Sequence, residues 1–439
     1  MKNRRTFMKQ AGTLTLLSPL AAASCTRRKP EPAAEALPFP QTIPAEKDGE
    51  PLGFKPHPIR VGDGKGGWQL HWGEVQLLRF GGDINKNRLC PFGLAQMDNG
   101  EVAMVAVIGH GSGVKVERPV IGFSRDGGAT WSDLKLIGEN IMGRPMMLDY
   151  LGDGVLTFQA GWSEGSKQVG YRFFSKDYGR TWPERVPLPV MPNGYPFPNE
   201  GNALVERDAR GLATRVVSFA WVEPPNVKHP VDAFIGGVVR SSDGGRTWSE
   251  PLKPKEWTWE EEYKGKRYLR GVSEGSLVRA ANGSIVAALR TDMPPRYFGH
   301  RNDDSLEGTA VSISKDDGKT WSPLKMVFEP GRHHAHLLRM PNNDLVMTVI
   351  VRDDVQNGKL ASYRRGCDAV VSHDNGLTWE TGRRYVLDEF EYYDNDKWFN
   401  GETGHLYSAL LNDGNILTTY GNYATKSAVL IRWKPIARF

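Results

Sequence analysis

The segment SEGSLVRAANGSIVAALR carries a glutamate, Glu274, and sixteen residues later an arginine, Arg290. Apolar residues flank the turn-forming sequence AANG between them, which predicts two antiparallel strands joined by a tight turn. Glu274 begins the first strand and Arg290 ends the second, so the two side chains are expected next to each other at one rim. A guanidinium there can hold an anionic group through charge-assisted hydrogen bonds, beside a carboxylate. The alternative interpretation is a solvated pair of rim charges.

Histidines gather in the segment GRHHAHLLR, where His334 and His336 are expected on the same face of a strand. Two imidazoles at this spacing invite interpretation as a metal site. The sequence offers no acidic residue or cysteine at a spacing recognisable for a third ligand, so we predict neither a metal nor any other cofactor. Contact with a substrate, or packing at the rim, is the favoured role for His334.

A motif of eight residues recurs five times, as SRDGGATW, SKDYGRTW, SSDGGRTW, SKDDGKTW and SHDNGLTW. An active site needs its parts once, whereas a repeated fold needs them in every repeat, so these motifs are predicted to be structural turns. The aspartate accepts hydrogen bonds from turn amides, the glycine adopts a conformation that other residues avoid, and the tryptophan covers the seam to the next sheet. The aspartates are therefore excluded as catalysts, namely Asp126, Asp177, Asp243, Asp316 and Asp374.

The motifs, which we call Asp-boxes, mark the units of a repeated all-β fold. Each follows a stretch patterned as two strands around a turn, and a sixth stretch, LYSALLNDGNILTTYGN, has no box after it. Six such units predict a six-bladed β-propeller. The strand GWQLHWGEVQLLRF, from Gly67, belongs to no unit. We expect it to supply the missing strand of the last blade and to close the ring, because closure removes unpaired edges.

With these features the sequence resembles the exo-sialidase (neuraminidase) family of bacteria and animals, whose members are six-bladed propellers with boxes of the form S-x-D-x-G-x-T-W. The resemblance covers the chain from Gly67 to Phe439. It includes the sixteen-residue interval, since the family carries a glutamate and, at that spacing, one arginine of a substrate-binding triad. The resemblance implies that Glu274 and Arg290 are site residues, and that Tyr407, in GHLYSALLNDGNIL, is the catalytic nucleophile.

The resemblance also implies further site residues. One more triad arginine corresponds to Arg365, or less favourably Arg364, in SYRRGCDAVVSHDNG. The remaining one corresponds to Arg88 in NRLCPFG, one residue out of register with its proline. Family members carry an acid/base aspartate between the second strand of blade one and its box, and this chain has none at that place. His110, or less favourably Glu117, is the expected substitute for moving the proton.

The function implied is that of an exo-α-sialidase-like glycoside hydrolase that removes terminal sialic acid from glycans with retention. Three guanidiniums suit the sugar carboxylate, and a neutral tyrosine assisted by Glu274 avoids the repulsion that an anionic nucleophile would meet. Arg144, ten residues before its turn glycine, either contacts the sugar or is only a charged rim residue. Two alternatives stay open: a glycosidase or lyase of another acidic or deoxy-sugar polysaccharide, and a non-catalytic sugar-binding propeller.

The N-terminus pairs Arg4 and Arg5 with a short apolar run and small residues, which predicts an export signal of the twin-arginine type over residues 1–24. Cys25 stands where a lipoprotein signal places its acylated cysteine, so both a lipid anchor and a free form are left open. Residues 25–57, rich in proline and charge, predict a tether, and residues 58–439 the propeller. We therefore expect an exported protein, periplasmic or at the cell surface.

The net charge indicates which class of binding partner to expect, and the cysteine content indicates whether a disulfide is expected. The net charge is +5, and residues 1–24 contribute four basic residues and no acidic ones, so the mature chain is nearly neutral. This gives no electrostatic reason to expect nucleic acid as a partner, and a glycan is expected instead. Cys90 and Cys367 are expected to be buried thiols rather than a disulfide. The oligomeric state is left open.

Overall fold

The computed structural model describes residues 42–43, 45–46, 53–80, 89–108, 118–138, 141–164, 167–191, 194, 196, 201–222, 232–299, 306–328, 330–391, 403–422, 425 and 427–436. The described part is all-β, as the sequence predicts. Its helices are single 3-10 turns, namely η1 (Lys255–Trp257), η2 (Pro295–Tyr297) and η4 (Thr381–Arg383). Within these ranges no helix has the length and apolar character needed to cross a membrane.

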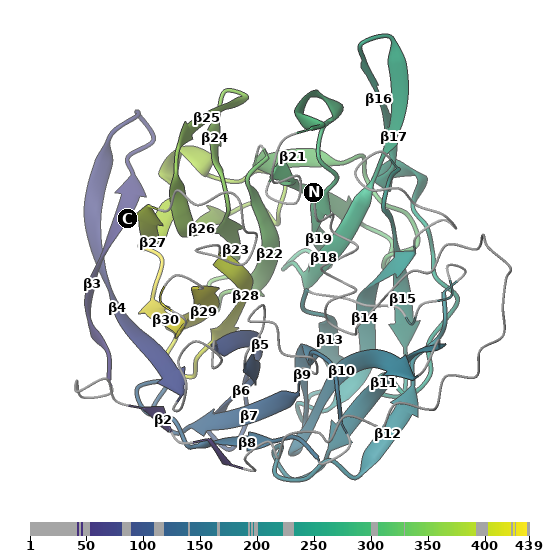
Figure 1. Ribbon diagram of the computed structural model, residues 1–439, viewed down its shortest axis with the longest axis vertical. Coiled ribbons are helices and arrows are strands. Elements are labelled where there is room, and N and C mark those ends of the chain that lie inside the picture. The colour runs from purple at the N-terminus through teal and green to yellow at the C-terminus, as the bar shows by residue number, and fades with distance from the viewer. Residues whose placement is uncertain are drawn as a thin grey trace, which may run out of the picture.

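Consecutive strands pair antiparallel in small sheets, and the sheets have a propeller-like arrangement about one axis (Figure 1). Three of them follow the order of the chain without crossing. The first contains β5 (Leu89–Gln96), β6 (Val102–Ile108), β7 (Pro119–Ser124) and β8 (Leu134–Leu136), with β1 (Thr42–Ile43) at its edge. The second contains β9 (Met146–Gly152), β10 (Val155–Glu164), β11 (Lys167–Ser175) and β12 (Glu184–Pro187), and the third β13 (Leu204–Arg207), β14 (Ala213–Val222) and β15 (Ile235–Ser241).

The second half of the chain continues the pattern. A fourth sheet contains β18 (Val272–Arg279), β19 (Ile285–Thr291), β20 (Gly308–Ser314) and β21 (Lys325–Phe328). A larger sheet joins β22 (Arg332–Arg339), β23 (Leu345–Val351), β26 (Arg364–Ser372) and β27 (Tyr385–Glu391) to β28 (Thr403–Leu410), β29 (Ile416–Asn422) and β30 (Ser427–Trp433). Two hairpins project from the sheets, β16 (Trp259–Tyr263) with β17 (Lys266–Arg270), and β24 (Asp354–Gln356) with β25 (Lys359–Ser362).

The first strands of the sheets lie nearest the axis (Figure 1). Each contacts the first strand of the next sheet along the chain, and β28 contacts β5. Second strands such as β19, β23 and β29 are buried at every position, because both of their faces are covered by neighbouring sheets. One core cluster accordingly combines Phe92, Phe158 and Leu417, which come from three different sheets.

The Asp-boxes form the structural turns that the repetition predicts. In the first box, Oγ of Ser124 donates to Asp126 at 2.8 Å, and the hydroxyl of Thr130 donates to the same carboxylate at 2.6 Å. The indole of Trp131 donates to the carbonyl of Gly128 at 3.0 Å. In the fourth box the corresponding hydrogen bonds from Thr320 lower the pKa of Asp316 to about 2. The hydrogen-bonding capacity of these carboxylates is used within their own turns.

A hairpin near the N-terminus, β3 (Lys55–Gly62) and β4 (Trp68–Phe80), lies between two parts of the larger sheet. On one side β4 pairs antiparallel with β30, with Leu78 opposite Ala428. On the other side β3 pairs with β27. The strand expected from Gly67 therefore joins the last sheet of the chain. The short strands β1, β2 (Ala45–Glu46) and the start of β3 fall within residues 25–57, so the folded body takes up parts of the expected tether.

Both remaining cysteines are buried free thiols, as the sequence predicts. Cys90 lies on β5 and Cys367 on β26, two strands of different sheets. Burial raises the pKa of Cys367 well above its ordinary value, so this thiol stays protonated.

Candidate functional site

Irregularities interrupt the pairing of the first strands. The pairing register shifts between Val272 and Glu274 in β18, between His333 and His336 in β22, and between Thr403 and Leu406 in β28. Strands β5 and β9 carry a shift as well. Such bulges add a residue to one strand and turn its side chains away from strict alternation. His334, at the bulge of β22, has a positive φ of 52°.

Glu274 and Arg290 lie directly opposite each other on β18 and β19, as their spacing predicts. Nη1 of Arg290 is 2.8 Å from Oε1 of Glu274, and Nε of Arg290 donates to the carboxylate of Glu307. Arg290 and Glu274 are both buried. The two side chains are therefore a desolvated, hydrogen-bonded ion pair and not the solvated rim charges of the alternative interpretation.

His334 completes this pair from the neighbouring sheet. Its Nδ1 lies 2.8 Å from Oε2 of Glu274, and its Nε2 lies 3.0 Å from Nη1 of Arg290 and 3.4 Å from Nη2 of Arg352. Burial lowers the pKa of His334 to about 4, so the ring is neutral near pH 7. Guanidiniums only donate, so Nε2 of the neutral ring accepts from them, and the ring proton then sits on Nδ1, the nitrogen that faces Glu274.

A second buried histidine, His405 on β28, lies at the same level. Its ring centroid is 5.0 Å from that of His334 and 4.3 Å from that of Phe92 on β5. Our sequence analysis missed His405, although a signal for it exists. Glu274, His334 and His405 each stand nine residues before the turn residue of positive φ in their hairpins, which are Gly283, Asn343 and Gly414. Equal spacing to the turn puts them at equal height on neighbouring strands.

Tyr407 lies two residues further along β28 than His405, which is about 6–7 Å along a strand. It is buried, and its ring centroid is 6.0 Å from that of His336. The pairs His334–His405 and His336–Tyr407 therefore form two successive levels between β22 and β28. Burial alone lowers the pKa of His336 to about 3, which keeps this ring neutral as well. We call the level of His334 and His405 the upper level and that of His336 and Tyr407 the lower level. Glu274 belongs to the upper level.

The neighbours Arg364 and Arg365 extend to opposite faces of β26, as alternation along a strand requires. Arg365 is buried and lies 3.0 Å from Asp353, the residue next to Arg352. Arg364 instead contacts Asp368 and lies 3.0 Å from Glu389. Arg364 thus lines a separate pocket on one side of β26, and Arg365 lies on the opposite side of that strand.

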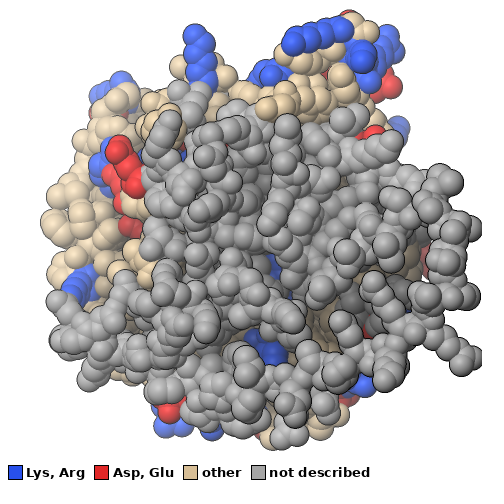
Figure 2. Space-filling view, viewed as in Figure 1, with Lys and Arg blue, Asp and Glu red and all other residues tan. Residues whose placement is uncertain are grey.

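Arg144 precedes β9 and is buried. Its guanidinium carbon is 5.7 Å from the ring centroid of Phe92, the ring that also contacts His405. Arg144 is therefore not a solvated rim charge. We call this set of buried, mutually contacting side chains the axial group; its members are Glu274, Arg290, His334, Arg352, His405 and Arg144. Lys and Arg side chains are also visible near the middle of the face shown in the space-filling view (Figure 2).

Four predicted positions, Arg88, His110, its alternative Glu117 and Cys25, lie outside the described residues, as does the predicted export signal over residues 1–24. Among the residues that the structure does describe, no three His, Cys, Asp or Glu side chains converge in a way that could hold a metal ion. The chemistry of the axial group is that of a buried carboxylate, several buried guanidiniums and neutral imidazoles. Such a set can bind an anion and support proton transfer next to it.

Comparisons with known proteins agree with this architecture. The model of the BNR repeat-like domain family matches residues 155–420. A sialidase from Bacteroides fragilis is 22% identical in an alignment 361 positions long, which covers 71% of this chain and 58% of that protein. The chain thus spans less than two thirds of the length of this curated relative.

Two solved structures share the fold. A Dyadobacter fermentans protein of unknown function superposes with a TM-score of 0.56 at 17% identity, over 82% of this chain and 99% of its own. The Hadza microbial sialidase Hz136 superposes with a TM-score of 0.52 at 15% identity, over 81% of this chain and 67% of its own. At these identities the likeness concerns the fold.

Proposed function

The chain belongs to the family of proteins with a BNR repeat-like domain, and on this premise we propose that it is a sialidase-like glycoside hydrolase. It removes a terminal acidic sugar, sialic acid in the first instance, from a glycan. The observation that carries the proposal is the contact of Glu274 with both Arg290 and His334 at the axial ends of two neighbouring sheets. A carboxylate that is buried and oriented by two blades is the kind of group that assists a nucleophile.

The scaffold that we propose for this site is a ring of six blades. The contacts between successive first strands, including that of β28 with β5, support it. The pairing of β4 with β30 supports the N-terminal strand as the element that closes the ring. A closed ring leaves only short, protected edges at the axis and holds the first strands at fixed distances from one another.

Arginines of the axial group suit a sugar carboxylate. Arg290 on β19 and Arg144, just before β9, are buried members of this group, and Arg365 on β26, also buried, and Arg88 are the further candidates from the sequence. Buried guanidiniums bind carboxylates through paired, charge-assisted hydrogen bonds that water competes with poorly. We therefore assign them to recognition of the carboxylate that sialic acid carries on its anomeric carbon.

The reaction that we propose is a double displacement with retention. The phenolic oxygen of Tyr407 forms a bond to the anomeric carbon while the bond to the leaving oxygen breaks, and Glu274 assists by accepting the phenolic proton. His110 is the candidate that protonates the leaving oxygen, in place of the absent aspartate. Water then hydrolyses the glycosyl-tyrosine and restores the phenol. Because Tyr407 lies a level below Glu274, the sugar must reach down to the level of His336, and the phenolic proton must cross the same gap to reach Glu274.

A second candidate function is favoured by one specific observation, the presence of His405 and His334 at the level of Glu274. Two imidazoles beside a carboxylate suit proton transfer on a different acidic or deoxy-sugar polysaccharide, by hydrolysis or elimination. In that case His405, rather than Tyr407, is the residue closest to the reacting atoms.

One experiment separates these functions. The mature protein and the variants Tyr407→Phe and His405→Asn are assayed for release of a fluorophore from an aryl α-sialoside. Turnover that is lost in Tyr407→Phe and kept in His405→Asn supports the tyrosine route. Full turnover in Tyr407→Phe contradicts it. Turnover of an acidic polysaccharide but not of the sialoside selects the second function, and calorimetric binding of sialic acid without turnover selects a sugar-binding propeller.

We also propose that the protein is exported to the periplasm or the cell surface through residues 1–24. Fractionation of cells that express the full chain, with Arg4 and Arg5 changed to lysine as the comparison, tests export. Cys25→Ala tests the lipid anchor, since an anchored protein then moves from the membrane fraction to the soluble one.

A further inference from the structure

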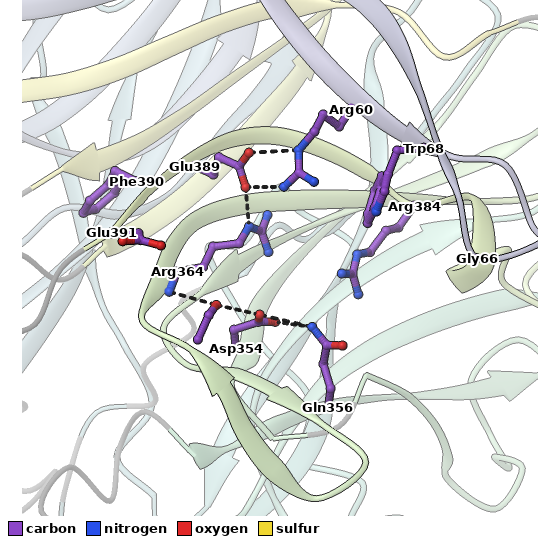
Figure 3. Close-up of a pocket in the computed structure, with 11 residues that line it drawn as sticks. Arg60, Gly66, Trp68, Asp354, Gln356, Arg364, Arg384, Glu389, Phe390 and Glu391 are labelled. Atoms are coloured by element: carbon purple, nitrogen blue, oxygen red, sulfur yellow. Dashed lines mark hydrogen bonds and ion pairs between the residues drawn. The ribbon is translucent and has the colours of Figure 1, made fainter.

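A pocket of about 720 Å³ lies between the β3–β4 hairpin and the strands β24 to β27 (Figure 3). It is within the size range of small-ligand pockets. Its walls include Arg60 and Trp68 from the hairpin, Gln356 from β24 and Arg384 just before β27. Arg364 lines it too, and Arg364 extends to the face of β26 opposite to that of Arg365. The pocket is therefore separate from the axial group.

Most charges around the pocket are neutralised by one another. Arg60 binds both carboxylate oxygens of Glu389, with Nε at 2.9 Å from Oε1. Arg364 is 3.0 Å from Glu389 and contacts Asp368. Asp354 is 2.7 Å from Arg332. These carboxylates have guanidinium partners already and have little capacity left for a further cation.

Arg384 is the exception. Its nearest carboxylate is Asp368, 3.8 Å from Nε, and that carboxylate is shared with Arg332 and Arg364. Within the described part of the chain, no hydrogen bond is formed by the guanidinium of Arg384, whose Nε is buried. Its terminal nitrogens therefore retain their full capacity to donate to a ligand.

The position of this guanidinium is fixed by Trp68. The indole ring lies 5.4 Å from the guanidinium carbon of Arg384 and 4.7 Å from that of Arg60. The close-up shows Arg384 beside Trp68 on the side of the pocket that faces Gln356, with Glu391 on the far side (Figure 3). A cation held by an aromatic ring in this way is oriented before any ligand arrives, which lowers the entropic cost of binding.

We propose that this pocket binds a sugar that carries a single carboxylate, with the carboxylate on Arg384. Oε1 of Gln356 is available for a sugar hydroxyl, because only the amide nitrogen of Gln356 is engaged, with Asp354 at 3.1 Å. Glu391, which forms no ion pair with any described residue, can accept hydrogen bonds from further sugar hydroxyls on the opposite side of the pocket. A polyanion is disfavoured, since additional negative groups would meet Glu389, Glu391 and Asp354.

The inference does not depend on the proposed hydrolysis, because none of these side chains belongs to the axial group. The same chemistry is offered by a free uronic acid and by the acidic end of an oligosaccharide. D-glucuronate represents the first source, and an oligosaccharide with one terminal glucuronate represents the second. D-glucose is the neutral match for either probe.

The experiment is calorimetric titration of the full chain and of two variants, Arg384→Gln and, as the matched control, the neighbouring exposed Arg383→Gln. We expect saturable binding of the acidic probes, weakened at least about tenfold in Arg384→Gln and unchanged in Arg383→Gln. Any binding at the axial group persists in Arg384→Gln as a separate site. Tighter binding of the oligosaccharide identifies a glycan as the natural source, and equal affinity identifies the free sugar.

Equal affinity for glucose and glucuronate, or unchanged binding in Arg384→Gln, would overturn the proposal. Absence of binding by the wild-type chain at about 10 mM probe would overturn it as well. If Arg384→Gln does not fold, Gln356→Ala takes its place, because Gln356 is exposed on a hairpin and its loss should weaken binding severalfold without affecting the fold.

Discussion

His334 and Glu274 connect two neighbouring sheets through a contact of 2.8 Å between Nδ1 and Oε2. Because the imidazole is neutral, this contact orients the carboxylate without cancelling its charge. The other carboxylate oxygen is held by Arg290 at 2.8 Å. Glu274 is thus fixed from within its own sheet and from the next one.

Replacement of Glu274 by glutamine should abolish its ability to assist a nucleophile while preserving its shape. We expect kcat/KM for the best substrate to fall by at least about 100-fold. The fold should persist, because Arg290 retains Glu307 as a partner. Enzyme kinetics and thermal unfolding measure the two effects. Glu260→Gln, at an exposed position on β16, is the control, and wild-type kinetics in Glu274→Gln would exclude a catalytic role.

The free energy of unfolding should decrease as the pH is lowered, partly because of His336. Its pKa is about 3 in the folded chain against an ordinary 6.5, so unfolding binds a proton between these values. The contribution of the neutral ring is complete above pH 6.5 and is lost as the pH falls toward 3, by up to about 1.4 kcal/mol per pH unit. Urea unfolding at pH 7, about 5.5 and about 4.5 measures this. His336→Gln should show a shallower decline, and an identical decline would refute the assignment.

The Asp-box carboxylates should matter for stability and not for catalysis. Asp243 accepts hydrogen bonds from the backbone amide and the hydroxyl of Thr247, at 2.9 Å and 2.7 Å. Asp243→Ala should lower the free energy of unfolding by about 1–3 kcal/mol and leave kcat unchanged. Ser242→Ala, at the exposed neighbouring position, should do neither. A loss of kcat in folded Asp243→Ala would give the box a role in the reaction.

The pairing of β4 with the last sheet predicts different effects for two adjacent leucines. Leu78 is fully buried, whereas Leu77 is 47% exposed. Leu78→Ala should cost about 3 kcal/mol and Leu77→Ala less than about 0.5 kcal/mol, both measured by denaturant unfolding. Equal, small effects would mean that β4 contributes little to the folded body.

Structural elements that depend on a sequence repeat, or on two residues a short interval apart, could be predicted from the sequence. The Asp-box turns, the hairpin that places Glu274 opposite Arg290, and the strand that joins β30 all depend on local patterns. His405 and the depth of Tyr407 depend on counting residues to a turn across different hairpins, a comparison that was available in the sequence. The pocket of Arg384 was not predictable, because Trp68 and Arg384 are more than three hundred residues apart in the chain.

The bulges of the first strands separate the part of each blade that holds the structure together from the part that meets a ligand. Between the extra residue and the hairpin turn the ladder is regular, and in β18 Glu274 is the first residue of that ladder. In the short upper segment at the bulge of β22, His334 is released from the inside–outside alternation. Point mutations in this short upper segment can therefore change what is recognised without shifting any strand. A scaffold of this kind is well suited to diversify its specificity during evolution while its core sequence stays constant.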